Sequence, residues 1–598
     1  MFSAHKGHKR RFPGGRLAAP LVAVAVAAAG AFLIAPAHAG QGSTTAANSQ
    51  LTNAQLRTRI NSAAGHLTTP NTVGAAKSTR SAAKPADGSA TVKPRIIGGS
   101  STPISSAPWM VQLIYLNSDG SGIFCGGTLV APNKVLTAGH CVDGLNWVQN
   151  GAVLGGTATL LPDTGGQVSA VRAQWLHPGY DGTAVNNDVA ILTLATPFNY
   201  KTLPLASATD TSLYTAGTQA TVYGWGVTDS APDSQNLAEN LQKLTLPENA
   251  DSECKSELGG ALGDENAFIP GHMICGGTGG TGDDATGKTT CSGDSGGPLV
   301  VSGKIIGIVS WGVSDDIQDC NVPGTYDVFT KVSAYGGNVQ PRINDSDISR
   351  DFRADVLAET PAGQSFEYDS TGSNLGTRHG APISSSNYDT VVQADLERDG
   401  YQDYIMRAKG SGNVFMAHRT PARASYSYIQ VGVGWNTRKA ILVPGDLTGD
   451  GIPDLLSEDS AGKVYIYSGK GNGLFNTPVL AGTGWLKYNL EFGHGDYTGD
   501  GKADVFARDA KTGALYLLAG TGSISAPFAA PVQVATGWNG FNAVIASGDV
   551  TGDARSDLLA RTPSGALFLF KGTSQAGTAI FSPWVKIGTG WNMYSRLS

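Results

Sequence analysis

Charge, cysteine and long apolar runs are scarce in this chain of 598 residues, and each scarcity excludes something. Charged residues make up 15% and the net charge is −6, so the basic excess typical of nucleic-acid-binding proteins is missing. The six cysteines all lie between Cys125 and Cys320, so disulfides cannot cross-link the residues after Cys320. No stretch beyond the N-terminal region is long and apolar enough to span a membrane.

Glycine, by contrast, is abundant: its 80 residues are about twice the usual share of roughly 7%. It does not recur at every third position, which excludes a collagen-like helix. Together with the many Ser and Thr residues, it indicates short strands joined by frequent turns. We therefore expect an all-β fold.

Residues 1–39 have the layout of a secretory signal peptide. Residues 5–16 are basic, residues 17–36 are apolar, and Ala37-His38-Ala39 offers small residues at the two positions that a signal peptidase reads. An uncleaved membrane anchor is the alternative, because about 20 apolar residues can span a bilayer. Proline and glycine interrupt the run, so we favour cleavage. We expect a secreted, extracellular protein without membrane attachment, exported by the Sec or the twin-arginine route.

Residues 40–95 contain no Phe, Tyr, Trp or Cys and are rich in Ala, Ser, Thr and Gly. We expect that such a segment cannot bury enough apolar area to offset the entropy lost on ordering. It is either a linker or a pro-segment, and the residues that follow it decide between the two.

Four widely spaced strings follow this segment. They are Arg95-Ile96-Ile97-Gly98-Gly99, TAGHC at 137–141, NNDVAIL at 186–192 and CSGDSGGPLV at 291–300. The chain thus carries His140, Asp188 and Ser295 in that order. Through these strings, residues 96–344 resemble the chymotrypsin/trypsin family of serine endopeptidases. The resemblance extends to CGGTLV at 125–130, YGWG at 223–226 and SWG at 310–312.

The resemblance implies a double β-barrel and the mechanism of a serine protease. Ser295 would be the nucleophile, His140 the general base, and Asp188 the residue that orients the imidazole. The backbone N–H groups of Gly293 and Ser295 would stabilise the oxyanion, and catalysis would need no cofactor. An inactive relative with the same fold is the alternative, but such proteins usually lose a triad residue and none is lost here.

The resemblance also gives the Arg95–Ile96 junction a meaning. In the family, cleavage before such an Ile start frees an α-amino group, which pairs with the Asp that precedes the catalytic Ser, here Asp294. We therefore expect a zymogen whose pro-segment, residues 40–95, is released by cleavage after Arg95. A plain spacer is the alternative for this segment.

Six cysteines permit 15 connectivities, and the family pattern selects three of them. The implied pairs are Cys125–Cys141, Cys254–Cys275 and Cys291–Cys320. The family normally closes with a long amphipathic helix. Residues 333–345 carry Gly and Pro, which disfavour a long helix, so we expect it to be shortened or replaced by packing.

The expected specificity pocket departs from that of trypsin-like relatives. Its walls include Ser310, Trp311 and Gly312. Thr289 stands where those relatives carry Asp. A gap-free alignment with these relatives puts Asp327 on the pocket wall opposite Thr289, where a carboxylate can pair with a basic substrate side chain. An alignment with an insertion moves Asp327 away and leaves a pocket for apolar side chains. We favour the first, which predicts a basic or mixed preference rather than a chymotrypsin-like one.

The second half, residues 345–598, contains a repeat with a period of about 50 residues. Five Asp triplets mark it: Asp347, Asp351 and Asp355; Asp395, Asp399 and Asp403; Asp446, Asp450 and Asp454; Asp496, Asp500 and Asp504; and Asp549, Asp553 and Asp557. Four short strand patterns fill one period, which is typical of a propeller blade. A Gly-Trp element recurs as well, and the last copy, at Trp591, ends the chain. We expect about five blades, with the last strand completing the first blade.

The loops at 446–454 and 496–504 resemble FG-GAP-type repeats, whose loops bind calcium. Several carboxylates around a Gly turn supply hard oxygen ligands, and the loop at 395–403 fits less closely. The predicted ligands are the Asp residues of these three loops. The loops at 347–355 and 549–557 lack the central Gly and are expected to be empty. Asp side chains that form Asx-turns without metal are the alternative.

The leading hypothesis is a secreted, zymogen-activated serine endopeptidase that acts on protein or peptide substrates. Its repeat domain would bind calcium and an unknown ligand. The rival is a non-catalytic adhesion or matrix-binding protein that uses the protease fold only as a platform. The intact triad and the Arg95 junction favour the enzyme.

Overall fold

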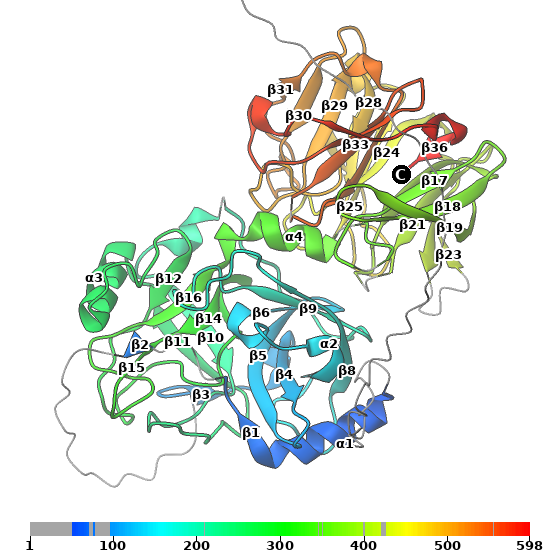
Figure 1. Ribbon diagram of the computed structural model, residues 1–598. Coiled ribbons are helices and arrows are strands. Elements are labelled where there is room, and N and C mark those ends of the chain that lie inside the picture. Colours follow the sequence, from blue (N-terminus) through cyan, green and yellow to red (C-terminus); the bar gives the residue numbers. More distant parts are fainter. Residues whose placement is uncertain are drawn as a thin grey trace, which may run out of the picture. The chain divides into compact units, whose positions relative to one another are not determined.

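The computed structural model describes residues 51–70, 76–77 and 96–598, with short gaps at 209, 345, 350, 399–400, 420–425 and 554. The predicted signal peptide, Arg95 and Asp399 therefore lie outside the described residues. Strands and turns dominate the described chain, which confirms the all-β prediction (Figure 1). None of its helices is long and apolar enough to cross a membrane.

The first part of the protease region is a closed barrel of six strands. Its hydrogen-bonded order is β5-β4-β7-β8-β9-β6, and β6 pairs again with β5 to close the ring. All residues of β4, β7 and β9 are buried, which explains their continuous apolar sequences. The strands are β4 (Met110–Leu116), β5 (Gly122–Ala131), β6 (Lys134–Thr137), β7 (Gly151–Gly155), β8 (Gln167–Leu176) and β9 (Ala190–Leu194).

The second part is an open sheet that forms half of a barrel. Its strands are adjacent in the order β12 (Met273–Gly276), β16 (Asp327–Lys331), β14 (Lys304–Trp311), β13 (Pro298–Val301), β10 (Gln219–Gly224), β11 (Gln242–Pro247) and β3 (Ser100–Ser101). Val222, Ile306 and Phe329 are fully buried in its core. The short strand β15 (Val313–Ser314) follows β14. The two parts confirm the expected double-barrel architecture.

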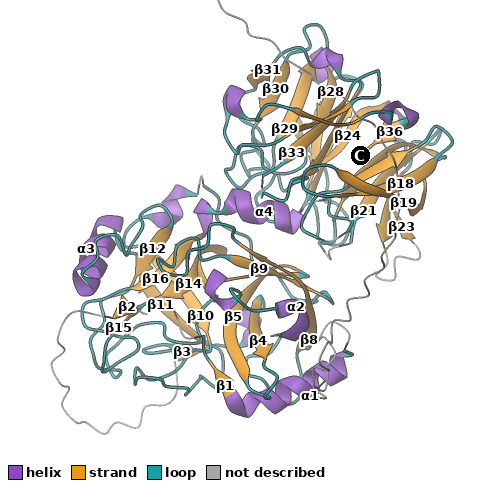
Figure 2. Cartoon of the chain, in the orientation of Figure 1, coloured by secondary structure: helices purple, strands orange, loops and turns teal. Residues whose placement is uncertain are grey.

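Three helices accompany the barrels: α2 (Trp147–Asn150), α3 (Asp251–Leu262) and α4 (Gly336–Asn344) (Figure 2). The closing helix α4 has only 9 residues, as the Gly and Pro residues of this segment predict. Its Val339 and Ile343 are buried in the core of the first barrel. A short helix is sufficient here because these two side chains lie one turn apart on the same face.

Helix α1 (Asn53–Ala63) shows that one expectation from the sequence was wrong. A capping box between Thr52 and Gln55 starts the helix. Leu56, Ile60 and Ala63 lie on one face and are buried against the first barrel. Residues 51–70 lack aromatic side chains and cannot build a core of their own, but they order here by docking on the core of the first barrel.

The repeat region consists of five four-stranded antiparallel sheets, which confirms the propeller prediction (Figures 1 and 2). The first three comprise β17 (Val356–Glu359), β18 (Gln364–Ser370), β19 (Leu375–Ser384) and β36 (Arg596–Leu597); β20 (Tyr388–Ala394), β21 (Asp403–Ala408), β22 (Val414–Arg419) and β23 (Tyr426–Gly432); and β24 (Arg438–Gly445), β25 (Asp454–Asp459), β26 (Val464–Tyr467) and β27 (Val479–Gly482). The last two comprise β28 (Tyr488–Phe492), β29 (Val505–Asp509), β30 (Leu515–Leu518) and β31 (Val532–Ala535); and β32 (Ala543–Gly548), β33 (Asp557–Arg561), β34 (Leu567–Phe570) and β35 (Val585–Gly588).

The C-terminal strand closes the ring of sheets. Ala358 of β17 pairs with Leu597 of β36, and Glu359 pairs with Arg596. The last strand thus completes the first blade, as the position of the final Gly-Trp element predicts. This pairing gives the first blade its fourth strand and ties the C-terminus to the start of the repeat region.

Candidate catalytic site

Strand pairing in the first barrel brings His140 and Asp188 together. Thr137, at the end of β6, pairs with Ala190, at the start of β9. His140 follows the first strand within a short 3-10 turn, and Asp188 precedes the second. The two side chains therefore meet at the same end of the barrel, although they lie 48 positions apart in the sequence.

The contact between these two residues uses both oxygens of the carboxylate. Nδ1 of His140 lies 2.9 Å from Oδ2 of Asp188, and the backbone N–H of His140 donates to Oδ1 at 2.7 Å. A Cβ atom at Gly139 would lie 3.1 Å from Oδ1, so a side chain there would crowd the carboxylate. The geometry fixes the orientation of the imidazole.

Ser310 and Thr330 complete the surroundings of Asp188. The Ser310 hydroxyl donates to Oδ2 at 2.6 Å, and the Thr330 hydroxyl donates to the Asp188 carbonyl at 2.8 Å. The pairing of β14 with β16 shifts register next to Ser310, a local irregularity that directs a strand residue toward the site. Burial by itself raises the pKa of Asp188, but the charge of His140 and the hydrogen bonds from His140 and Ser310 outweigh burial and lower it.

Ser295 lies in the loop between Cys291 and β13, and only 4% of it is exposed. Its carbonyl accepts the N–H of Gly126 at 2.8 Å, which ties the loop to β5. Nε2 of His140 is buried and has no hydrogen-bond partner among the described residues. Gly293 has a φ of +94°, and a Cβ there would lie 2.6 Å from a side-chain carbon of Leu237. Only glycine fits this turn.

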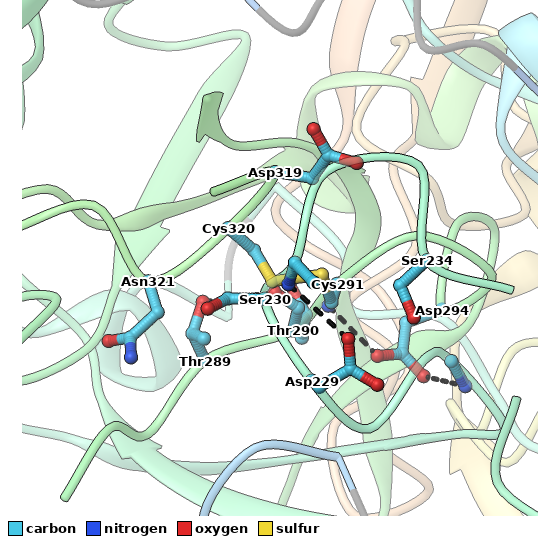
Figure 3. The surroundings of a disulfide bond; sticks show 12 residues. Asp229, Ser230, Ser234, Thr289, Thr290, Cys291, Asp294, Asp319, Cys320 and Asn321 are labelled. Atoms are coloured by element: carbon cyan, nitrogen blue, oxygen red, sulfur yellow. Dashed lines mark hydrogen bonds between the residues drawn. A yellow bond between two sulfur atoms is a disulfide. The ribbon is translucent and has the colours of Figure 1, made fainter. Parts of the chain in front are cut away.

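Asp294 is fully buried, and its carboxylate accepts two backbone N–H groups, from Gly226 at 2.7 Å and from Cys291 at 3.1 Å (Figure 3). Burial raises its pKa to about 7. Ile96 is fully buried, and Ile97 packs with Cys291. The first residues after the Arg95 junction thus lie in the core next to the loop that carries Asp294.

The pocket beside Ser295 is a cavity of about 40 Å³, and its lining includes Ser295, Ser310, Trp311 and Gly312. Asp327 lies just behind this lining, next to Thr290. Its Oδ1 accepts the Thr289 hydroxyl at 2.5 Å, and its Oδ2 accepts the N–H of Thr290 at 2.9 Å. Burial raises the pKa of Asp327 to about 7.

A family model described as trypsin matches residues 96–337. The chain is 39% identical to a trypsin of Saccharopolyspora erythraea over 249 residues, which is 42% of this chain and 98% of that protein. The chain belongs to the trypsin family. It is a trypsin-like serine endopeptidase, so the rival hypothesis of a purely adhesive protein is wrong.

Further relatives and a solved structure cover the same region. The chain is 34% identical to a trypsin of Simulium vittatum (40% of this chain, 90% of that protein) and to trypsin II-P29 of Gallus gallus (42% and 89%). The crystal structure of the scabies mite inactivated protease paralogue S-D1 aligns with 23% identity and a TM-score of 0.35, over 41% of this chain and 96% of that one. A family model described as FG-GAP-like repeat matches residues 496–560.

The three disulfides pair as the resemblance implies: Cys125–Cys141, Cys254–Cys275 and Cys291–Cys320. The first joins β5 to the turn that carries His140. The third joins the Ser295 loop to the segment that leads into β16 (Figure 3). Two catalytic loops are thereby tied to neighbouring structure.

The Asp loops of the repeat region use their carboxylates to fix the loop backbone. In the loop 446–454, Asp446 accepts the N–H groups of Gly449 and Gly451 at 2.6 Å each. Asp454 accepts those of Leu447 and Gly469 at 2.8 and 3.0 Å. The loop 496–504 repeats this pattern. These are the Asx-type turns that the alternative interpretation predicts.

The same carboxylates are crowded. Burial, and next the neighbouring Asp446, raise the pKa of Asp454 to about 8; burial and Asp500 raise that of Asp496 to about 6. A cation would relieve such repulsion, although the carboxylate oxygens of these triplets do not form a compact metal cluster among the described residues. In the loop 395–403, Asp403 accepts the N–H of Leu396 at 3.0 Å in the same way, and its other oxygen lies 2.9 Å from Nδ1 of His418. Within the described residues, the one cluster compact enough to hold a metal is Cys125, His140 and Cys141, whose cysteines form a disulfide.

Sequence reasoning missed the roles of Ser310 and Thr330 at Asp188. The signal for Ser310 was present in the SWG string, which the sequence analysis assigned only to the pocket wall. Thr330 carries no motif of its own. Its contact depends on the register of β16 against β14, which the sequence does not display.

Proposed function

We propose that this endopeptidase cleaves peptide bonds with the triad Ser295, His140 and Asp188, and that it is made as a zymogen. The hydrogen-bonded pair of His140 and Asp188 carries the proposal, since the buried Nε2 of His140 has no partner among the described residues and can take a proton. Ser295 Oγ attacks the carbonyl carbon while its proton passes to Nε2, which then donates it to the leaving amine. Water releases the acyl group by the same route.

The negative charge that develops on the substrate oxygen needs fixed donors. We assign this role to the backbone N–H groups of Gly293 and Ser295, because the loop that carries them is fixed by its glycine turn and its bond to β5. One such donor contributes about 3–4 kcal/mol to the transition state in mutational tests.

Activation by cleavage after Arg95 gives Asp294 the partner that it lacks in the uncut chain. In the uncut chain the Ile96 nitrogen is an amide, and among the described residues the buried carboxyl of Asp294 accepts hydrogen bonds from two neutral N–H groups. A free α-amino group at Ile96 would supply a positive charge, lower the pKa of Asp294 and stabilise the loop from 291 to 295.

The zymogen proposal is tested by blocking the cut. Arg95→Gln should leave the secreted chain uncut and without amidase activity, whereas the wild-type chain should yield a product that starts at Ile96. N-terminal sequencing identifies the product. An uncut wild-type chain that is as active as the cut one would contradict the proposal.

We further propose a preference for Arg or Lys before the scissile bond, with Asp327 as the counter-charge. A positively charged substrate side chain would stabilise the ionised form of this buried carboxyl, which otherwise has two neutral hydrogen-bond donors. A chymotrypsin-like preference is the second candidate, since Thr289 replaces the usual floor Asp. A peptide library varied at this one position, tested with the enzyme that starts at Ile96, separates the two.

The repeat region would serve binding or positioning of an unknown ligand, stabilised by calcium in the loops 446–454 and 496–504. Asp446, Asp450 and Asp454, with their counterparts in the second loop, would hold the ion. The signal-like N-terminus and the three disulfides support export to an oxidising, extracellular compartment.

A further inference from the structure

The segment before the activation junction is bound to the protease region through specific contacts. Besides the buried stripe of Leu56, Ile60 and Ala63, helix α1 carries two polar anchors. Arg57 donates to the carbonyls of Pro162 and Gly165, at 3.3 and 2.5 Å. Asn61 donates to the carbonyl of Asp163 at 3.3 Å. The helix thus docks on the first barrel in one register.

From this helix the chain leads directly to the catalytic loop. Leu67 and Thr68 form β1 (Leu67–Thr68), which pairs in parallel with Gly122 and Ile123 of β5. A Cβ atom at Gly293, the proposed oxyanion residue, would lie 3.3 Å from the methyl group of Thr69. The segment therefore lies against the loop where a substrate carbonyl would have to bind.

The next described residues lie on the other side of the same site. Ala76 and Lys77 form β2 (Ala76–Lys77), which pairs in parallel with β15. This strand directly follows Ser310, Trp311 and Gly312, three residues that line the cavity beside Ser295. The described parts of the segment therefore add one short strand to the first barrel and another to β15, which follows the residues that line the pocket.

We propose that the segment carrying residues 51–70 and 76–77 is an inhibitor that occupies the substrate-binding face and stays bound after the chain is cut. The inference rests on the proposed cleavage after Arg95. None of the contacts above passes through the Arg95–Ile96 bond, so cutting that bond forms the α-amino group without removing the inhibitor. Activation then has two steps: the cut, and the release of the segment.

The consequence is that cleavage alone gives a suppressed enzyme. Cutting turns the intramolecular contact into one between two chains, and the local concentration that the covalent linkage provides is lost. The fragment then leaves at a rate set by its own affinity, and dilution favours its release. A second protease that digests the fragment would complete activation.

The test uses the full chain with residues 91–95 replaced by an Asp-Asp-Asp-Asp-Lys site, so that enteropeptidase cuts directly before Ile96. Two variants are compared with it. Leu56→Asp with Ile60→Asp places two charges in the buried stripe. Ala54→Asp with Thr58→Asp places the same charges at the same spacing on the exposed face of the helix.

After complete cutting, we expect the chain with the native segment and the exposed-face control to show less than a tenth of the amidase activity of the Leu56/Ile60 variant. Their activity should rise on dilution, and the fragment should co-elute with the enzyme in gel filtration. Equal activity in all three cut chains, with the fragment eluting separately, overturns the inhibitor proposal and leaves the zymogen proposal intact. Inactivity of all three cut chains refutes both, because cleavage would then not activate the enzyme.

A second measurement does not depend on folding of the variants. A synthetic peptide of residues 46–77 is added to wild-type enzyme that has been cut and freed of its fragment. It should raise the KM for a small amide substrate and leave kcat unchanged. The Leu56→Asp, Ile60→Asp peptide should inhibit at least tenfold more weakly. Equal potency of the two peptides, or no inhibition, contradicts the proposal.

Discussion

The protease region and the repeat region both depend on buried carboxylates, but they hold them in different ways. In the protease region, Asp188, Asp294 and Asp327 each have their own set of donors, drawn from distant parts of the chain. In the repeat region, Asp446 and Asp496 accept the same backbone N–H groups from within their own loops.

This difference reflects the two tasks of the carboxylates, which are catalysis or recognition in the first region and stabilisation of loops in the second. A catalytic carboxylate must be oriented toward one reacting group, so its partners have to converge from several strands. A loop carboxylate that fixes a turn needs only its neighbours in sequence, so the same solution can be copied from blade to blade. Changes in the first region should therefore alter activity, and changes in the second should alter stability.

The largest effect is expected from Ser295→Ala. The loss of the nucleophile should lower kcat by about 10⁶-fold, the scale known for triad serines. The melting temperature of the full chain should stay within a few degrees, because the change removes only one hydroxyl oxygen. Labelling by a serine-reactive fluorophosphonate should vanish in parallel. Persistent labelling of the variant would mean that another residue is the nucleophile.

Asp188→Asn should lower kcat by about 10⁴-fold, the loss known for this change in trypsin-type triads. The amide preserves the shape but stabilises the wrong tautomer of His140. Ser310→Ala, which removes one hydrogen-bond donor to Asp188, is the matched milder change and should lower kcat much less. A loss in Ser310→Ala as large as that in Asp188→Asn would show that the hydroxyl has a direct catalytic role.

Asp327→Asn should remove most of the preference for basic residues, a change of about 10²-fold in the ratio of kcat/KM for an Arg substrate to that for a Phe substrate. Because the pKa of Asp327 is about 7 in the free enzyme, its ionised fraction grows between pH 6 and 8. The ratio should rise over this range in the wild type and stay flat in the variant. Titration of the triad affects both substrates equally and cancels in the ratio. A flat wild-type ratio would favour the apolar candidate.

The smallest effect is expected from calcium. In the full chain carrying Ser295→Ala, chelation should lower the melting temperature of the repeat region by several degrees, because crowded carboxylates lose their counter-charge. Asp450→Asn with Asp500→Asn should abolish the shift. Asp459→Asn, an acidic residue outside the Asp triplets, serves as the control. If calcium has no effect on the wild type, the loops are Asx-turns without metal.

The motifs predicted much of this molecule because each of them is local. The Gly-Trp and Asp-loop repeats gave the five blades and the closure of the ring, and the three catalytic strings gave the triad. The segment before Ile96 was misjudged, since Leu56, Ile60 and Ala63 look too few for a core when the surface that receives them is not known. Ser310 was assigned only to the pocket wall, but its hydroxyl donates a hydrogen bond to Asp188.

The sequence by itself determined the family and the repeat, and it predicted which residues are the nucleophile, base and orienting acid, since these motifs are carried by contiguous residues. The tertiary structure decided where Asp327 lies, which donors reach Asp188, and that residues before the junction cover the catalytic loop. These depend on strand register and on which surfaces meet. A shift of one residue in a strand turns every side chain to the opposite face, so only the folded chain fixes them.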